Sequence, residues 1–328
     1  MQKNQKLKQN LKMKGWLLIM REIKTVKEST YEERAKLFDA IMENIKPLDF
    51  DKDGNVITAS ARIPLELLFI DFRYQRIHKD KGVKNLYDNW DVRKLAPVSV
   101  APHEEDKCFS LIDGGNRSTV GYMLGIPSMT ATIMMQAPKD DASRLKFECE
   151  IFSTQNSESE NVRLVEKHPA NVIIGDKAAV IIDKLAKEYD VAFANTTGQR
   201  DSAILGSYAD TYQIAKTENG EDILEFIFSI IQNAGWHDET NGYATYVFRA
   251  LKSVWIAHPD NREDIHKFLS TELRQYDPEL FGASSRAKYP KRDYRSACVL
   301  YAEDLVCDGM HIDRRIYKDG EKRYMISK

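Results

Sequence analysis

The chain has 328 residues, of which 42% are hydrophobic and 30% are charged, so it can build one large domain or two ordinary ones. With 48 Lys and Arg against 50 Asp and Glu, its formal net charge is −2, and no overall positive field draws it onto nucleic acid. No apolar run reaches the length of a membrane span, and the four cysteines form no Cys-x-x-Cys pair, which predicts a cytoplasmic protein with reduced thiols and no membrane partner.

The N-terminal segment has an unusual composition. Residues 1–19 are rich in Lys, Gln and Asn and end in a short apolar piece without the small-residue cleavage site of a secretory signal. Two interpretations stay open. Residues 1–19 are either a basic disordered arm or not part of the native protein, in which case Met20 is the start.

The first helix is predicted over residues 30–45. Ser29 or Thr30 can cap it, and each is followed three residues later by a glutamate, which is a capping-box pattern. Pro47 ends this helix. Residues 1–50 are therefore expected to form an arm and a helix ahead of the main fold.

Short strands and helices alternate in the next part of the chain, residues 51–160. Strands are predicted over 55–59, 62–70, 97–101, 109–112 and 129–135, and helices over 79–90, 116–124 and 138–153. This order predicts an α+β domain with a small sheet, although periodicity alone does not identify a particular fold.

Residues 161–328 are predicted to form a mainly α-helical domain. Helical spacing covers 161–173, 176–189, 207–217, 220–234, 242–257, 261–275 and 293–306. Apolar stripes on two of these helices indicate a buried core. No helix-turn-helix stands out, because the turn within residues 207–234 has no distinctive chemistry.

The strongest functional signal is the segment 111–118 (LIDGGNRS). An apolar strand ends in two glycines, and a helix begins at once. Glycines let a backbone approach a ligand closely, and a helix N-terminus offers unpaired N–H groups with a partial positive charge. Arg117 adds a planar fork of donors that suits phosphate. The pattern predicts an anion-binding turn, and the alternative is a tight turn with a surface arginine.

This turn resembles the signature of the ParB/sulfiredoxin superfamily, which carries Gly-x-x-Arg, often within Asp-Gly-x-His-Arg, at a strand–helix junction. Asp113, Gly114 and Arg117 match that signature, and Asn116 stands where the family usually has His.

Flanking segments in the same order support the resemblance. Residues 63–76 are similar to the family's Pro-led strand and Tyr-Gln-Arg turn, and 90–100 to the entry into its second strand. Residues 150–156 are similar to the Phe-x-x-Gln-Asn helix end that is common in phage and mobile-element members. The resemblance covers about a third of the chain and ends near residue 175.

The resemblance implies a small mixed ParB/sulfiredoxin-like sheet with helices, ahead of the helical region. It also implies a protein of phage or mobile-element DNA biology that binds a nucleotide or nucleic-acid phosphate, with CTP or ATP and Mg as the expected cofactor. The expected phosphate-binding residues are Gly114, Gly115, Asn116, Arg117, Ser118, Gln75, Arg76, Gln155 and Asn156.

Catalysis by the same pocket stays open as an alternative. The superfamily includes a free-serine kinase and CTP-hydrolysing partition proteins, so nucleotide hydrolysis, phosphoryl transfer and Mg-dependent DNA cleavage are all considered. The catalytic candidates are Asp113, Glu150 and His78, with Glu148 as a further carboxylate that could converge with the first two. Sulfiredoxin activity is not expected, because Gly115 stands where that enzyme has its nucleophilic cysteine. A third interpretation is a degenerate domain that serves only as an interaction scaffold.

A locally basic segment lies at residues 285–295 and is predicted to be a loop. Its cations are Arg286, Lys288, Lys291, Arg292 and Arg295. Cations interleaved with tyrosines suit a nucleic-acid backbone, which makes DNA a candidate partner, and a solvated loop is the alternative. The His and Cys residues show no metal-ligand spacing, so no metal site is predicted. The sequence leaves homo-oligomerisation undecided.

Overall fold

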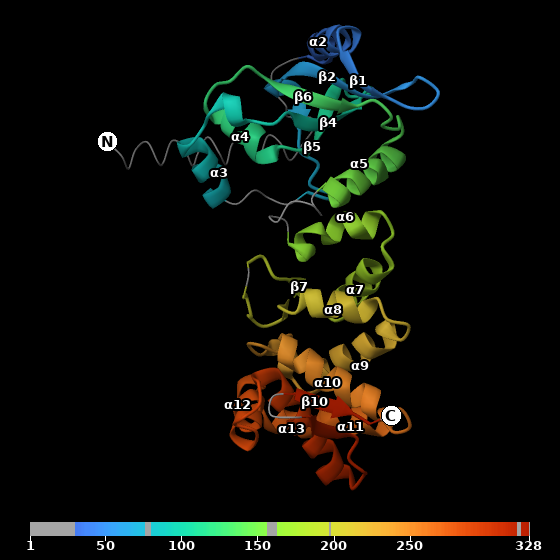
Figure 1. Cartoon of the computed structure of the whole chain (residues 1–328), viewed down its shortest axis with the longest axis vertical. Coiled ribbons are helices and arrows are strands. Elements are labelled where there is room, and N and C mark those ends of the chain that lie inside the picture. The colour runs from blue at the N-terminus through green and yellow to red at the C-terminus, as the bar shows by residue number, and fades with distance from the viewer. Residues whose placement is uncertain (1–29, 76–79, 156–162, 197, 320–322, 328) are drawn as a thin grey trace, which may run out of the picture. The chain divides into compact units, whose positions relative to one another are not determined.

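A computed structural model describes residues 30–75, 80–155, 163–196, 198–319 and 323–327. The chain divides into two compact units between Ile174 and Gly175. Short strands form a mixed sheet in the N-terminal unit and helices dominate the C-terminal unit, which confirms the predicted α+β class (Figure 1). No helix of the described segments is long and apolar enough to cross a membrane.

The N-terminal unit is built around a six-stranded sheet in the order β1-β2-β6-β4-β5-β3. Its strands are β1 (Lys46–Phe50), β2 (Val56–Pro64), β3 (Leu68–Phe69), β4 (Val98–His103), β5 (Cys108–Asp113) and β6 (Ser128–Met134). The pairs β3–β5 and β4–β6 are parallel, and the other neighbours are antiparallel. The helices are α2 (Tyr31–Glu43), α3 (Asp80–Asp88), α4 (Gly115–Met123), α5 (Asp141–Gln155) and α6 (His168–Ile173).

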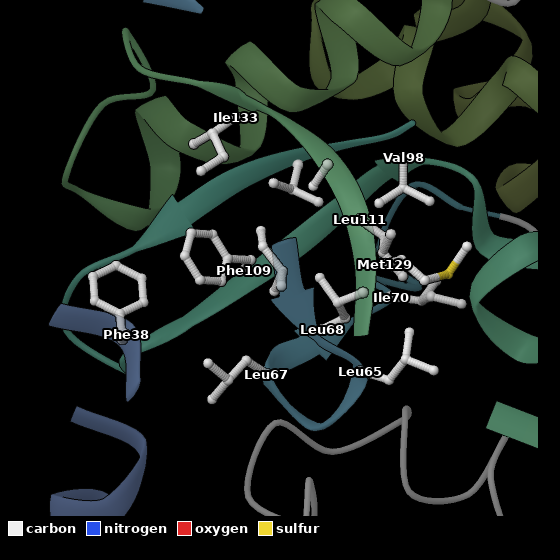
Figure 2. Close-up of a cluster of buried hydrophobic side chains, with 13 residues drawn as sticks. Phe38, Leu65, Leu67, Leu68, Ile70, Val98, Phe109, Leu111, Met129 and Ile133 are labelled. Carbon is white, nitrogen blue, oxygen red and sulfur yellow. The ribbon is translucent and has the colours of Figure 1, made fainter. Parts of the chain in front are cut away.

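Apolar side chains cover both faces of this sheet. Along β5, Leu111 belongs to one buried cluster and Ile112 to another, as expected for neighbours on a pleated strand. The first cluster, shown in Figure 2, includes Phe38 of α2, whose ring centroid lies 4.7 Å from that of Phe109. The second cluster lies under α5 and α6 and includes Phe152. Burial on both faces explains why consecutive residues of β4 and β5, such as Val100 and Ala101 or Leu111 and Ile112, are apolar.

Local signals place the first helix as predicted. Thr30 Oγ1 accepts a hydrogen bond from the Glu33 amide, and the Glu33 carboxylate accepts one from the Thr30 amide, so the capping box forms. In the structure, strand β1 follows this helix directly. The sequence predicted only that the helix ends at Pro47. All residues of β1 are exposed, so the strand lacks the alternating pattern by which a strand is recognised.

The C-terminal unit is mainly helical. Its helices are α7 (Lys177–Glu188), α8 (Tyr208–Ala215), α9 (Gly220–Asn233), α10 (Thr245–Ala257), α11 (Arg262–Glu272), α12 (Pro278–Lys288) and α13 (Tyr294–Met310). Two small sheets complete it, the parallel pair β7 (Ala192–Phe193) and β8 (Ile204–Leu205) and the antiparallel pair β9 (Ile316–Asp319) and β10 (Arg323–Ile326). The predicted apolar stripes of α9 and α10 are buried, including Ile227 and Val254.

The predicted basic loop over residues 285–295 is wrong. Residues 285–288 end α12, residues 294–295 begin α13, and only a short connection separates the two helices. Asp277 caps α12 through the Leu280 amide, and Pro278 occupies its first turn. The sequence concealed this helix because its core-facing positions are filled partly by Gly282 and Ser285, which give a weak hydrophobic period.

Candidate phosphate-binding turn

The predicted strand–glycine turn–helix is present, with β5 ending at Asp113 and α4 beginning at Gly115 (Figure 1). Gly114 is the N-cap of α4 and has a left-handed backbone (φ 101°, ψ 16°). Its side chain is a hydrogen atom, so no side chain at this position caps the helix. The first intrahelical hydrogen bond among the described residues joins the Ser118 amide to the Gly114 carbonyl at 2.9 Å. The amide N–H groups of the first turn therefore stay available to an anion.

Glycine is required at position 114 for two separate reasons. The positive φ is a conformation that residues with a side chain rarely adopt. A Cβ added there would also lie 2.5 Å from Cγ1 of Val98 and 3.1 Å from a guanidinium nitrogen of Arg117. The turn thus brings the backbone against the first residue of β4.

Arg117 is held by the protein itself. Its Nη1 donates to the carbonyls of Ala96 (2.5 Å) and Pro97 (3.0 Å), and its Nη2 donates to the Asp113 carboxylate at 2.5 Å. Only 17% of the side chain is exposed. Arg117 therefore braces the approach to β4 against the start of α4. Loss of Arg117 should therefore disturb the fold as well as any ligand, and a role for its remaining N–H groups in anion binding stays a prediction.

Two other residues of the turn have unpaired polar atoms. Asn116 Oδ1 and Ser118 Oγ are buried and have no hydrogen-bond partner among the described residues. The Asn116 amide nitrogen lies next to Gly82 of α3, where an added Cβ would be 3.5 Å away. Helix α3 thus flanks the start of α4.

The predicted Tyr-Gln turn contacts the end of β5. Gln75 Nε2 donates to the carbonyl of Leu111, and the Ile112 carbonyl lies 3.4 Å from the same nitrogen. The structure therefore places Gln75 beside the strand that leads into Gly114.

Other predicted residues cannot be placed in this way. Arg76, His78 and Asn156 lie outside the described residues. Gln155 is the last residue of α5, and its side chain is outside the description as well.

A buried polar network centred on Glu148 packs against strand β5. The Glu148 carboxylate is 1% exposed and accepts hydrogen bonds from Ser110 Oγ (2.5 Å) and Tyr74 OH (3.2 Å), while His103 Nε2 lies 3.2 Å from it. Burial and the Glu148 charge raise the pKa of Tyr74 well above its ordinary value, so the phenol stays a donor. The sequence singled out Glu148 only as a carboxylate and gave no signal of these partners, which come from β4, β5 and the Tyr-Gln turn.

The carboxylates considered as a metal-nuclease cluster point in different directions. Glu148 is buried in its network, whereas Glu150, two residues further along α5, is exposed because successive helical residues turn about 100° around the axis. Asp113 pairs with Arg117. Among the described residues, Asp113, Glu148 and Glu150 form no group able to share one ion, so their expected convergence is corrected.

The structure instead brings His258, Glu303 and Cys307 together in the C-terminal unit, with ligand atoms within 4.8 Å of one another. Glu303 already accepts hydrogen bonds from the backbone amides of Arg315 (2.6 Å) and Ile316 (2.9 Å), and His258 Nε2 lies 2.9 Å from its other oxygen. This arrangement is that of a structural anchor for β9.

The cations of the basic segment have separate partners. Lys288 pairs with the buried Asp304 at 2.7 Å, and Arg286 Nη1 donates to the Arg292 carbonyl at 2.6 Å. Lys291 and Arg295 are exposed. Arg292 Nη1 donates to the Asp319 carbonyl at 3.5 Å. Three of the five predicted nucleic-acid contacts, Arg286, Lys288 and Arg292, therefore already have partners within the C-terminal unit.

Replacing Glu148 by glutamine should lower the free energy of unfolding by about 1–3 kcal/mol, because an amide nitrogen would face buried donors. The matched control is Glu150→Gln on the exposed side of the same helix, which should change it by less than about 0.5 kcal/mol. Urea unfolding measures both values. Equal stabilities for the two variants would contradict the structural role given to the network.

No protein-family model and no curated protein matches this chain. A search of solved structures gives the C-terminally truncated chromosome-partitioning protein ParB from Caulobacter crescentus, complexed with CTP-gamma-S. The two chains are 15% identical, the match covers 75% of this chain and 98% of that one, and the TM-score is 0.25. At this TM-score the match carries no argument about function, and the resemblance to the ParB/sulfiredoxin superfamily depends on the sequence motifs.

Proposed function

We propose that this protein binds the phosphate of a nucleotide or of nucleic acid at the turn formed by Gly114–Ser118. The observation that carries the proposal is the left-handed Gly114, which leaves the first amides of α4 without a side-chain cap at the end of a buried strand. Unpaired amides, the positive end of a helix and an adjacent guanidinium together favour a phosphate.

The proposed ligand is CTP or ATP with Mg, and the proposed setting is the DNA biology of phages or mobile elements. Both follow from the sequence resemblance at Asp113, Gly114 and Arg117. Asn116 supports binding more than chemistry at this position, because an amide can donate and accept hydrogen bonds but does not titrate near neutral pH.

The test changes the charge of the turn without changing its shape. Asn116→Asp introduces a carboxylate of nearly equal size at the second residue of α4, where it should repel a phosphate yet suit the helix dipole. We expect a loss of affinity for CTP and ATP on the order of ten-fold or more. Because Asn116 Oδ1 is buried, the melting temperature is recorded for each variant and the titration is made where both are fully folded. Titration calorimetry with and without Mg²⁺ measures the affinity.

The matched control is Asn219→Asp, which makes the same change at the exposed N-cap of α9 in the other unit. This variant should bind as the wild type does. Unaltered nucleotide affinity in the Asn116→Asp variant would overturn the assignment of the site. Release of inorganic phosphate during the titration, abolished by Asn116→Asp, would show that the pocket is catalytic and replace binding with hydrolysis.

A further inference from the structure

We propose that the C-terminal unit contains a second, separate site for a phosphate group, in a cleft of about 510 Å³. The cleft is formed by residues 198–200 ahead of β8, the start of α10 and the start of α13. Its lining includes Arg200, Thr245, Tyr246, Tyr294 and Arg295. This inference is independent of the site at Gly114, because it involves other residues in the other unit.

Two guanidinium groups from distant parts of the sequence meet at this cleft. Arg200 has one long side-chain contact, 3.5 Å from its Nη1 to Asn241 Oδ1, and its carbonyl accepts the Asn241 amide at 2.8 Å. Arg295 is exposed, and within the described part of the chain its side chain shows no hydrogen bond or ion pair. Both forks therefore keep donors for a ligand, and planar forks of this kind match the oxygens of a phosphate.

The carboxylates near the cleft accept hydrogen bonds, and Asp293, which lines the cleft, also interacts with the charge of Arg295. Asp293 caps α13 by accepting the Ser296 amide at 3.1 Å. Asp210 accepts from Arg249 Nη2 at 2.9 Å and from Thr245 Oγ1 at 3.1 Å. Asp201 and Glu279 nearby accept hydrogen bonds from Gln199 Nε2 (3.0 Å) and Asn241 Nδ2 (3.1 Å). Each of these carboxylates thus has a donor, whereas the guanidinium groups of Arg200 and Arg295 keep N–H groups for a ligand, and an anion complements such donors.

The walls of the cleft suit a ligand larger than an ion. Its volume falls within the usual range of small-molecule sites, roughly 300–1,000 Å³. Tyr294 is 40% exposed and packs edge-to-face against Tyr246, with ring centroids 5.1 Å apart. The cleft thus combines anion donors with an aromatic wall, which suits a phosphate that carries an organic group, whether in a mononucleotide or in a polynucleotide.

The N-terminus of α10 adds positive potential to the cleft. Its N-cap is Ala244, which lines the cleft and has no side-chain acceptor. The amides of the first turn of α10 are therefore uncapped by that residue. The helix supports the site, and the two arginines define it.

The experiment compares the full-length chain with its Arg200→Ala/Arg295→Ala variant. The probes are inorganic phosphate, AMP and a 12-nucleotide single-stranded DNA, measured by titration in the Asn116→Asp background so that the turn at Gly114 does not contribute. We expect at least a ten-fold loss of AMP affinity in the double variant and an unchanged melting temperature. If the double variant fails to fold, Arg295→Glu takes its place, because that side chain is exposed and makes no contact on which folding depends.

The matched control is Lys291→Ala. Lys291 is an exposed cation in the connection between α12 and α13 and does not line the cleft. Its affinity for AMP should stay within two-fold of the parent. Loss of binding to AMP alone identifies a mononucleotide as the source of the phosphate, and loss for the DNA as well identifies a polynucleotide. Equal affinities in the parent and the double variant, or an equal loss in Lys291→Ala, would overturn the proposal.

Discussion

Replacing Gly114 by alanine should lower the free energy of unfolding of the N-terminal unit by about 2–5 kcal/mol. Part of this loss comes from the left-handed backbone, whose φ is 101°. The other part comes from packing, because the new methyl group would lie 2.5 Å from Val98 Cγ1. Val98 is fully buried at the start of β4 and cannot move away without disturbing the sheet core.

The matched control lies at the other end of the same helix. Gly125 also has a positive φ of 72°, but an added Cβ would meet nothing within 4 Å. Gly125→Ala should therefore cost only the backbone strain, about 1–2 kcal/mol. Urea unfolding together with hydrogen exchange of the β4 and β5 amides measures both changes. Equal losses in the two variants would show that the contact with Val98 is not important.

Glu303→Gln should lower the free energy of unfolding of the C-terminal unit by about 3–5 kcal/mol at pH 7. The wild-type carboxylate is completely buried. One of its oxygens accepts hydrogen bonds from the amides of Arg315 and Ile316, and the other lies 2.9 Å from His258 Nε2. A glutamine would direct its NH₂ group at one of these donors and leave a buried group unsatisfied. The control is Asp308→Asn, which removes an exposed acid from the same helix and should be nearly neutral.

The effect of Glu303 should depend on pH in a defined direction. Burial alone would raise the pKa of Glu303, but the hydrogen bonds from His258 and the two backbone amides hold it below its ordinary value of 4.5. Because the folded pKa is the lower one, the stabilisation is complete above the ordinary value and is lost as the pH falls through the folded pKa.

The stability difference between the wild type and Glu303→Gln should consequently be constant near neutral pH and shrink below about pH 4.5. Urea midpoints between pH 7 and pH 3 give this difference directly. A gap that does not change with pH would mean that the charge of Glu303 contributes nothing to folding.

Short-range patterns predicted much of the fold. The capping box at Thr30 and Glu33 and the apolar stripe of α9 involve residues only a few positions apart, where helical geometry dictates which groups meet. The junction at Gly114 was predictable for the same reason, since an apolar strand, glycine and a helix start follow one another directly. Segments without a hydrophobic period escaped detection, as the exposed strand β1 and the helix α12 show.

The partners of the site residues were not predictable. Arg117 has the charge and planar donors expected of an anion-binding residue, yet it donates hydrogen bonds to carbonyls 20 and 21 residues earlier in the chain. Glu148 differs from Glu150 only by which side of α5 it occupies, and the sheet decides which of the two is buried. Neither outcome is contained in the spacing of the residues.

The sequence by itself determined the local elements, the class of the fold and the turn at which a phosphate is proposed to bind. The tertiary structure alone decided that Arg117 serves as a brace, that Glu303 meets His258 across 45 residues, and that Arg200 and Arg295 share a cleft. The physical reason is that hydrogen-bond rings and hydrophobic periods act over a few residues, whereas pairing of distant side chains depends on how whole elements pack and which polar groups that packing buries.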